Sequence, residues 1–233
     1  MRSSNTTEDR KLAVVVVAAG ESRRFGSDKL AATIGDRTVL ERSVEAMRNA
    51  LADAPLVVAV ASARVEFWRH VLEPKVDGLE VIVGGERRQD SVRIGVERAA
   101  ADGAEIVVIH DGARPLVHPD DVRRVVAGLG DGSAAILCAE VVDTVKRIDD
   151  EGIVVDTIDR SMLRTAQTPQ ICRVAALESA WAVQNPSVEF SDEAALLESA
   201  GVGVRCVVGE HPNPKLTTVD DMLVVRSLGG DDA

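Results

Sequence analysis

The chain has 233 residues, of which 45% are hydrophobic and 28% charged; this is the balance of a folded globular protein and excludes a disordered or collagen-like chain. It contains 27 Lys and Arg against 38 Asp and Glu, so its net charge is −11, and aromatic residues make up only 2%. An acidic chain with so few stacking side chains argues against nucleic acids and anionic membranes as partners.

The longest apolar run, residues 12–19, is far shorter than the ~20 residues that span a bilayer. Residues 1–10 are polar and lack the features of a secretory leader, so we expect them to form a disordered tail. The sequence therefore predicts a cytoplasmic protein with no membrane partner.

Strand-like and helix-like segments alternate along the chain. Val- and Ile-rich runs predict six strands, at residues 12–18, 56–61, 79–83, 105–109, 134–139 and 204–208. Start signals predict four helices, at Thr38 with Glu41, Pro119 with Asp120 and Asp121, Ser191 with Asp192 and Glu193, and Thr218 with Asp221. Nearly continuous apolar strands are typical of sheets covered on both faces. We therefore expect one α/β domain over residues 1–233, built as a sandwich around a mostly parallel sheet.

Residues 141–158 interrupt this alternation. Two β-rich runs flank Asp149-Asp150-Glu151-Gly152, and acidic residues followed by Gly predict a hairpin turn. Because a lone two-stranded hairpin is marginal in water, it must pack on another surface. A second subunit is one such surface.

Cysteine and histidine spacing gives no sign of a metal or redox centre. Cys138, Cys172 and Cys206 are widely separated and form no CxxC pair, so we expect buried, reduced thiols.

The loop after the first strand is the first candidate site. It reads AAGESRRFGSDK over residues 18–29, where small residues let backbone N–H groups approach phosphate oxygens. Arg24 and Lys29 add positive charge suited to a polyphosphate. The dinucleotide fingerprint fails because residue 22 is Ser, and the P-loop fails because Gly26 is followed by Ser27.

An ordered set of motifs then extends along the chain. After AAGESRRFG come GGERRQDSV at residues 84–92, HDGARP at 110–115, DTVK at 143–146, DR at 159–160, TPQ at 168–170, SDEA at 191–194 and PKLT at 214–217. This order resembles the 2-C-methyl-D-erythritol 4-phosphate cytidylyltransferase family over about residues 12–228. The chain departs from the family at Ser22, where Gly is usual, and at Asp28-Lys29-Leu30, where PKQ is usual.

The resemblance implies a Rossmann-like nucleotidyltransferase with a protruding β-hairpin arm, here residues 141–160, that makes a homodimer. It implies transfer of CMP from CTP to 2-C-methyl-D-erythritol 4-phosphate with release of pyrophosphate, and a chain without the cyclodiphosphate synthase domain fused to some members. Both reactants are anions, so positioning and charge neutralisation are the main needs.

The resemblance also assigns candidate residues by position. Catalytic roles fall on Arg24, Lys29, Arg160 and Lys215. CTP contacts fall on Ala18, Ala19, Gly20, Gly85, Arg88 and Ser91. Contacts to the phosphate acceptor fall on Asp111, Arg114, Thr144, Lys146 and Thr168. Mg²⁺ is the implied cofactor, and the residues leave open whether Asp111 binds it or whether only the CTP phosphates do.

Two other functions stay open at this point. A ribitol- or other polyol-phosphate cytidylyltransferase would share the loop, the HDGARP segment and the arm. A nucleotide-binding domain without turnover would fit Ser22 and Asp28, because Asp28 places a negative charge beside Lys29. A nicotinamide-dependent dehydrogenase is disfavoured by the failed glycine fingerprint.

Overall fold

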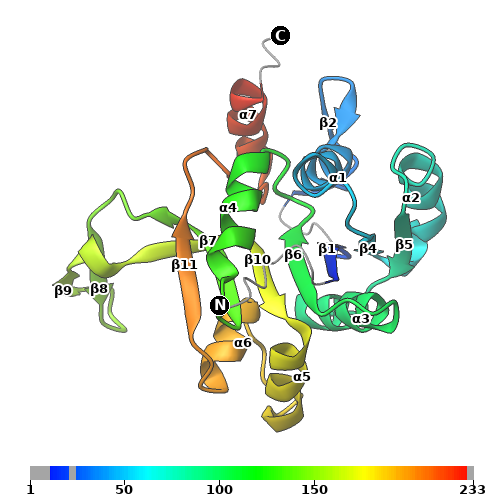
Figure 1. The fold of residues 1–233 in the computed structure, drawn as a ribbon. Helices are drawn as coiled ribbons and strands as arrows, with labels where there is room; N and C mark the ends of the chain where they lie inside the picture. The colour runs from blue at the N-terminus through cyan, green and yellow to red at the C-terminus, as the bar shows by residue number, and fades with distance from the viewer. Residues whose placement is uncertain (1–10, 21–24, 230–233) are drawn as a thin grey trace.

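A seven-stranded sheet forms the centre of the molecule in the computed structural model, which describes residues 11–20 and 25–229 (Figure 1). Its order is β11-β7-β10-β6-β1-β4-β5. Every neighbouring pair is parallel except those made by β10, which runs antiparallel to β6 and β7. The mostly parallel sheet is thus confirmed. The tail of residues 1–10 and the candidate Arg24 lie outside the described residues.

The strands of this sheet match the predicted apolar runs and add one more. They are β1 (Leu12–Ala18), β4 (Leu56–Val60), β5 (Leu79–Val83), β6 (Ile106–Asp111), β7 (Ala134–Glu140), β10 (Arg164–Arg173) and β11 (Val204–Val208). The added strand, β10, contains the cis Thr168–Pro169 bond and an irregular register between Ala166 and Gln170. A Pro within a run argues against a central strand, and this explains why the sequence did not predict it.

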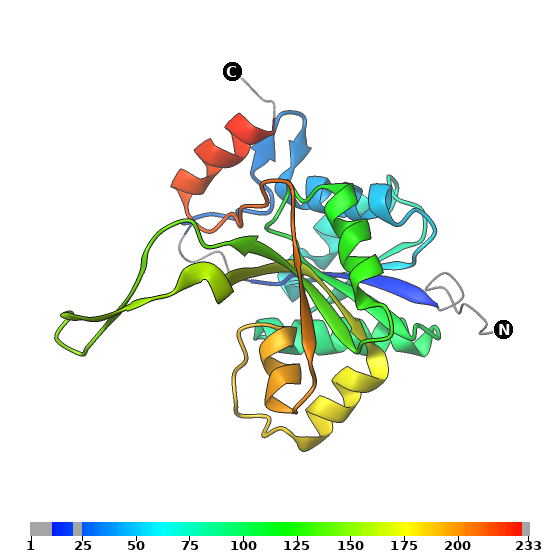
Figure 2. The same ribbon diagram turned by 60° about the vertical axis from the view of Figure 1, so that its left-hand side comes forward.

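Helices cover both faces of the sheet (Figure 2). One layer contains α1 (Val39–Ala50), α2 (Val65–Leu72), α4 (Pro119–Leu129) and α7 (Val219–Leu228), and the other α3 (Arg88–Ala101), α5 (Val174–Val183) and α6 (Glu193–Ser199). Successive residues of β1 enter different cores: Val14 and Val16 pack under α1 and α4, while Val15 and Val17 pack under α3. This two-sided burial is why β1 reads as a continuous apolar run. No helix among residues 11–20 and 25–229 is long and apolar enough to cross a membrane.

Helix starts follow the expected capping chemistry. The Thr38 side chain accepts from the Glu41 N–H and the Glu41 carboxylate accepts from the Thr38 N–H, which closes a capping box at α1. The same reciprocal arrangement joins Thr218 and Asp221 at α7. At α6 the capping residue is Asp192, within the predicted start signal. A short β2–β3 ladder (Thr33–Ile34, Arg37–Thr38) and two 3₁₀ turns, η2 (Ser62–Arg64) and η3 (Arg160–Met162), complete the elements outside the arm.

The hairpin predicted over residues 141–158 is present as β8 (Val145–Ile148) and β9 (Val154–Ile158), an antiparallel pair that projects from the body (Figure 2). Its turn uses Gly152 at φ 82°, and the Asp149 carboxylate accepts N–H bonds from Glu151 and Ile153. Both strands are mostly exposed. We refer to residues 141–160 as the arm.

Cysteine burial differs from the expectation at one position. Cys138 and Cys172 are buried, whereas Cys206 is exposed. Cys206 lies on β11, an edge strand that has a neighbour on only one side, so burial expected from its apolar surroundings in the sequence was wrong.

Arg48, near the end of α1, connects this helix by hydrogen bonds to the chain before β4 and to the chain before β5. Its guanidinium donates to the carbonyls of Leu51, Ala52, Ala54 and Asp77, which precede β4 and β5. We expect Arg48→Met to lower the free energy of unfolding by about 2 kcal/mol, because these carbonyls lose a charged donor. Urea denaturation measures the change. Arg93→Met, which removes an exposed pair with Glu97 and a cation–π contact with Trp181, is the control and should cost at most about 1 kcal/mol; equal losses in the two variants would contradict the prediction.

Candidate active site

Three loops meet at the carboxyl edge of the sheet. The register pairs Val17 of β1 with Asp111 of β6, and Ala18 with Val60 of β4. The Gly112 N–H donates to the Val17 carbonyl over 2.9 Å, and the Gly84 N–H donates to the Val60 carbonyl over 2.7 Å. In open α/β sheets, ligands bind at the C-terminal ends of the parallel strands. The candidate residues in ranges 18–20, 84–91 and 111–114 lie at or just after such strand ends.

The first loop ends with Lys29 directed at a distant segment. Its Nζ donates to the Leu216 carbonyl over 2.9 Å. The neighbouring Asp28 forms an ion pair with Arg64 at 2.9 Å and accepts the Leu30 N–H. Arg64 therefore compensates much of the negative charge that Asp28 places beside Lys29.

The second loop packs tightly against the first. A Cβ on Gly84 would lie 2.7 Å from the Cβ of Ala19, and one on Gly85 would lie 2.4 Å from the Cβ of Asp90, so neither position admits a side chain without movement. The buried Ser91 hydroxyl accepts the Gly85 N–H over 3.1 Å. The structure thus brings Ala19, Gly85 and Ser91 together, and Ser91 shapes the loop by bonding its backbone.

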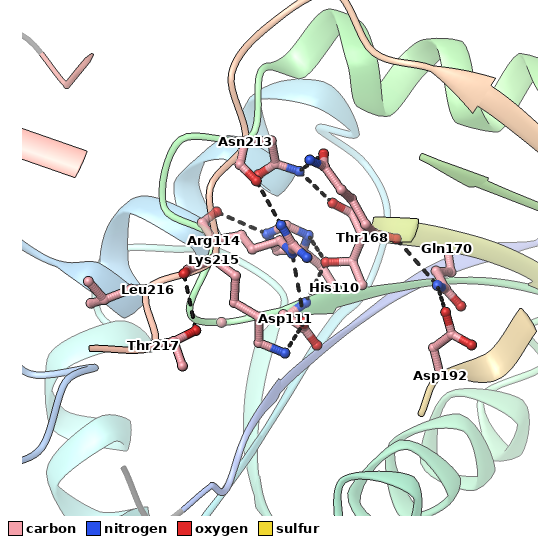
Figure 3. Close-up of polar contacts among 12 residues, drawn as sticks. His110, Asp111, Arg114, Thr168, Gln170, Asp192, Asn213, Lys215, Leu216 and Thr217 are labelled. Carbon is pink, nitrogen blue, oxygen red and sulfur yellow. Dashed lines mark hydrogen bonds and ion pairs between the residues drawn. The ribbon is translucent and has the colours of Figure 1, made fainter. Parts of the chain in front are cut away.

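A buried carboxylate surrounded by cations lies at the end of β6. Asp111 is 6% exposed; its Oδ1 is 3.0 Å from Arg88 Nε and its Oδ2 is 2.7 Å from Lys215 Nζ. Arg114 Nε lies 3.7 Å from Oδ2 (Figure 3 shows Asp111, Arg114 and Lys215). Burial alone would raise the pKa of Asp111, but Arg88, Lys215 and Arg114 outweigh it and hold that pKa well below its usual range.

Arg88 joins this group, here called the Asp111 cluster, to α6. Its guanidinium donates to both Glu193 oxygens, over 2.8 and 3.0 Å, as well as to Asp111. Burial would lower the pKa of Arg88, but the two carboxylates outweigh it and raise that pKa. Three cations and two carboxylates leave one net positive charge in a chain of net charge −11. Glu193 was predicted only as part of a helix start, because its partner lies 105 residues away.

Hydrogen bonds made by the uncharged side chains of Thr168 and His110 connect to the backbone of Asp111 and Arg114 in the cluster (Figure 3). The Thr168 hydroxyl accepts the Asp111 N–H over 3.0 Å and lies 3.1 Å from His110 Nδ1. His110 Nε2 is 3.2 Å from the Arg114 carbonyl, which can only accept, so Nε2 carries the proton and Nδ1 accepts from Thr168. Thr168, predicted to contact the acceptor, therefore lies beside Asp111 with its hydroxyl engaged in this network.

Burial lowers the pKa of His110 to about 4, against an ordinary value of 6.5. In the unfolded chain His110 takes up its proton near pH 6.5, whereas in the folded chain it stays neutral down to about pH 4. Its contribution to the free energy of unfolding is therefore full above pH 6.5 and decreases as the pH falls towards 4. We expect His110→Gln to flatten the dependence of the unfolding free energy on pH between 6.5 and 4, as measured by urea denaturation. The exposed His70→Gln should keep the wild-type slope; a wild-type slope in His110→Gln would contradict this.

The segment between β11 and α7, residues 209–217, connects these groups. Lys215 bonds Asp111, the Leu216 carbonyl accepts from Lys29, and the Asn213 carbonyl accepts from Arg114 over 2.7 Å. The Asn213 amide also donates to the Thr168 carbonyl over 2.8 Å. Sequence reasoning placed Lys215 in the site but missed Asn213, which has no motif signal except its position two residues before Lys215.

The candidates on the arm lie apart from this site within the same chain. Lys146 Nζ donates to the Thr157 hydroxyl over 2.6 Å, and Arg160 donates to the Val142 carbonyl, so both bond within the arm. Thr144 directly precedes β8. The structure therefore gathers Lys29, Arg88, Asp111, Arg114, Thr168 and Lys215, and leaves Thr144, Lys146 and Arg160 on the arm.

The described residues provide no set of protein ligands for a metal ion. They contain no group of three or more His, Cys, Asp or Glu side chains placed to hold one. Asp111, the predicted ligand, has its Oδ1 engaged by Arg88 and its Oδ2 by Lys215. A carboxylate already surrounded by three cations does not fit the role of a direct Mg²⁺ ligand.

Comparisons with known proteins point to one family. The family described as 2-C-methyl-D-erythritol 4-phosphate cytidylyltransferase matches residues 12–228. A protein of that name from Rhodococcus opacus is 39% identical over 217 residues, covering 92% of this chain and 93% of its own. A bifunctional enzyme IspD/IspF from Rhodospirillum rubrum is 39% identical over 215 residues; this chain covers only 55% of it, about half its length.

Solved structures agree with these relatives. The crystal structure of 2-C-methyl-D-erythritol 4-phosphate cytidylyltransferase from Thermus thermophilus aligns with a TM-score of 0.77 and 30% identity, over 94% of this chain and 99% of that one. The overall fold described above is therefore shared with a solved member of this family.

Proposed function

The chain belongs to the 2-C-methyl-D-erythritol 4-phosphate cytidylyltransferase family, and from this membership and the site geometry we propose that it transfers CMP from CTP to 2-C-methyl-D-erythritol 4-phosphate. A phosphate oxygen of the acceptor forms a new bond to the α-phosphorus of CTP. The bond from that phosphorus to the β-phosphate oxygen breaks, and pyrophosphate leaves. The products are pyrophosphate and 4-diphosphocytidyl-2-C-methyl-D-erythritol.

One observation supports this reaction most directly: the buried Asp111 cluster carries a net positive charge and touches the segment that also binds Lys29. A phosphate monoester is already ionised near pH 7, so the attacking oxygen needs no general base. What the reaction needs is that two anions be brought together and the charge in the transition state be neutralised. Fixed cations at the edge of the sheet meet that need.

Roles for individual residues are part of the proposal. Lys29 and Arg24 would neutralise the CTP phosphates, with Ala18, Ala19, Gly20, Gly85 and Ser91 shaping the nucleotide loops. Lys215 and Arg160 would bind the acceptor phosphate, and Asp111 would orient Lys215 and Arg114. Arg88 is predicted as a CTP contact, but its guanidinium is bonded to Asp111 and Glu193. These bonds favour a role in which Arg88 holds Asp111 in place.

Mg²⁺ enters the proposal only as a companion of CTP. Mg²⁺ prefers to keep several waters and to bind phosphates together with one or two carboxylates, so the triphosphate can carry it to the site. When bound there it would neutralise phosphate charge. Localisation in the cytoplasm stays a prediction from the sequence.

The test is an assay of pyrophosphate release over a grid of the four nucleoside triphosphates and several polyol phosphates. The proposal expects release only with CTP and chiefly with 2-C-methyl-D-erythritol 4-phosphate. Preference for ribitol 5-phosphate would instead support the polyol-phosphate alternative. Nucleotide binding without release of pyrophosphate in any well would overturn both.

The arm adds an expectation about assembly. Ile148, Val154 and Val155 are large apolar residues that lie exposed on it, and Thr144, Lys146 and Arg160 lie on it away from the Asp111 cluster. We infer that the arm pairs two copies of the chain and brings these residues to the partner's site. Exposed apolar surface on a two-stranded ribbon is otherwise unfavourable.

Deleting residues 143–156 and joining the ends with a short Gly linker is expected to give a monomer that still binds CTP. The reason is that the nucleotide loops belong to the body, whereas the apolar contact area belongs to the arm. Analytical ultracentrifugation and calorimetric titration with CTP measure the two properties. An intact protein that sediments as a monomer at micromolar concentration would refute the role of the arm.

A further inference from the structure

Besides the side-chain contacts of Asn213 and Lys215 described above, backbone hydrogen bonds hold the segment 209–217 to the body near both of its ends. At its end the Leu216 N–H donates to the Ala113 carbonyl over 2.8 Å. At its start the chain leaves β11, and the Gly209 N–H donates to the Cys138 carbonyl over 2.9 Å. Asn213 and Lys215 lie between these points, and the carbonyl that binds Lys29 belongs to Leu216 itself.

A single buried carboxylate binds the start of this segment. Asp121, in the first turn of α4, is fully buried and accepts the Glu210 N–H on Oδ1 over 2.9 Å and the His211 N–H on Oδ2 over 3.1 Å. The His211 ring nitrogen Nδ1 also lies 3.1 Å from Oδ2. Hydrogen bonds to a carboxylate are shorter and stronger than neutral ones, and a buried donor left without its partner is costly.

Asp121 does more than its place in a helix requires. Asp120, its neighbour in the same first turn, carries the same charge near the N-terminus of α4 but is exposed and bonds Arg123. Both carboxylates lie in the first turn, where negative charge is favoured by the helix dipole. Only Asp121 turns inward to bind the backbone of another segment, 89 residues further along the chain.

We propose that Asp121 is a positioning residue for the transfer reaction. By binding the N–H groups of Glu210 and His211 it helps to set the path of the segment, and so the place of the Lys215 ammonium. This rests on the function proposed above, in which Lys215 binds the acceptor phosphate. A small misplacement of such a group can slow a reaction by up to about 10²-fold.

The test compares Asp121→Asn with Asp120→Asn in the full-length chain. Asparagine keeps the shape of Asp121, but its one carbonyl oxygen can serve one N–H, and its amide faces the other donor. We expect Asp121→Asn to lower kcat/KM for 2-C-methyl-D-erythritol 4-phosphate by about 10- to 100-fold, with the KM for CTP changed less than about threefold. Asp120→Asn removes the same charge from the same turn and should stay within about twofold of the wild type.

A double-mutant cycle separates positioning from general damage. If Asp121 acts through Lys215, Asp121→Asn should cost less than about threefold more once Lys215→Ala is present. If the variant merely weakens the fold, its full effect should persist in that background, and this would overturn the proposal. Should Asp121→Asn not fold by circular dichroism, Asp121→Ser, whose hydroxyl can accept one N–H, takes its place in the same cycle.

The outcomes distinguish this inference from the function on which it rests. A wild-type chain that releases no pyrophosphate with any polyol phosphate overturns the proposed function, and the inference with it. A wild-type chain that is active, with Asp121→Asn indistinguishable from Asp120→Asn, overturns only the positioning role. A selective loss at Asp121 that disappears in the Lys215→Ala background supports it.

Discussion

Replacing Lys29 with alanine is expected to lower turnover by about 10²–10³-fold while the fold stays intact, by analogy with the loss of a preorganised charge at other transfer centres. Lys29 ends the first loop, and water can replace its bond to the Leu216 carbonyl because the side chain is half-buried rather than enclosed. In the proposed reaction, however, its charge lies where the two anionic reactants meet. The loss should therefore fall on kcat rather than on stability.

Lys11→Ala is the matched control for this experiment. Lys11 directly precedes the other end of β1 and is exposed, so the substitution removes the same charge from the opposite edge of the sheet. Pyrophosphate release and thermal unfolding should both stay near wild type. A folded Lys29→Ala protein with wild-type turnover would refute the assignment of Lys29. From the sequence alone, Arg24→Ala should behave like Lys29→Ala, and Arg23→Ala should be much milder.

Asp111→Asn is expected to damage stability and activity together. Asparagine fills the same space, but Arg88, Arg114 and Lys215 then lose the anion they share. Breaking a buried ion pair by removing one partner costs about 3–5 kcal/mol, and the retained Glu193–Arg88 pair should keep the loss near the lower end of that range. With Lys215 and Arg114 no longer held by the shared carboxylate, turnover should fall by at least about 10²-fold.

Urea denaturation and pyrophosphate release measure the two effects of Asp111→Asn. Asp102→Asn is the control, because Asp102 is exposed and pairs with Arg98 at the surface, where such pairs contribute little. Should Asp111→Asn prove as stable and as active as Asp102→Asn, the cluster would have no role in the site.

Local signals explain which parts of the fold the sequence could predict. β1 packs on both faces, so its composition alone identifies a covered strand, and Thr38 with Glu41 closes the α1 cap within three residues. β10 has no such signal, because its Pro169 argues against a central strand and its pairing partners lie far away in the chain.

In the candidate site too, residues with a local motif could be predicted and residues without one could not. Asp111, Arg114 and Lys215 stand in recognisable motifs, and the structure brings them together. Glu193, Asn213 and Asp121 contribute through contacts with residues 45 to 105 positions away, and no local spacing reports such contacts. What the sequence could not supply is the set of partners that orient the motif residues.

The arm connects two strands that are neighbours in the sheet, so the two halves of the chain could stay together after a cut in the arm. The arm leaves from β7 and returns into β10, and these two strands pair directly, from Glu140 with Arg164 to Ala134 with Cys172. A protease cut in the turn at Asp149–Gly152 would therefore leave two polypeptides joined by that ladder. The first would contain Lys29 and Asp111 and the second Thr168 and Lys215, so the cluster would be assembled from two separate fragments, as in a split enzyme.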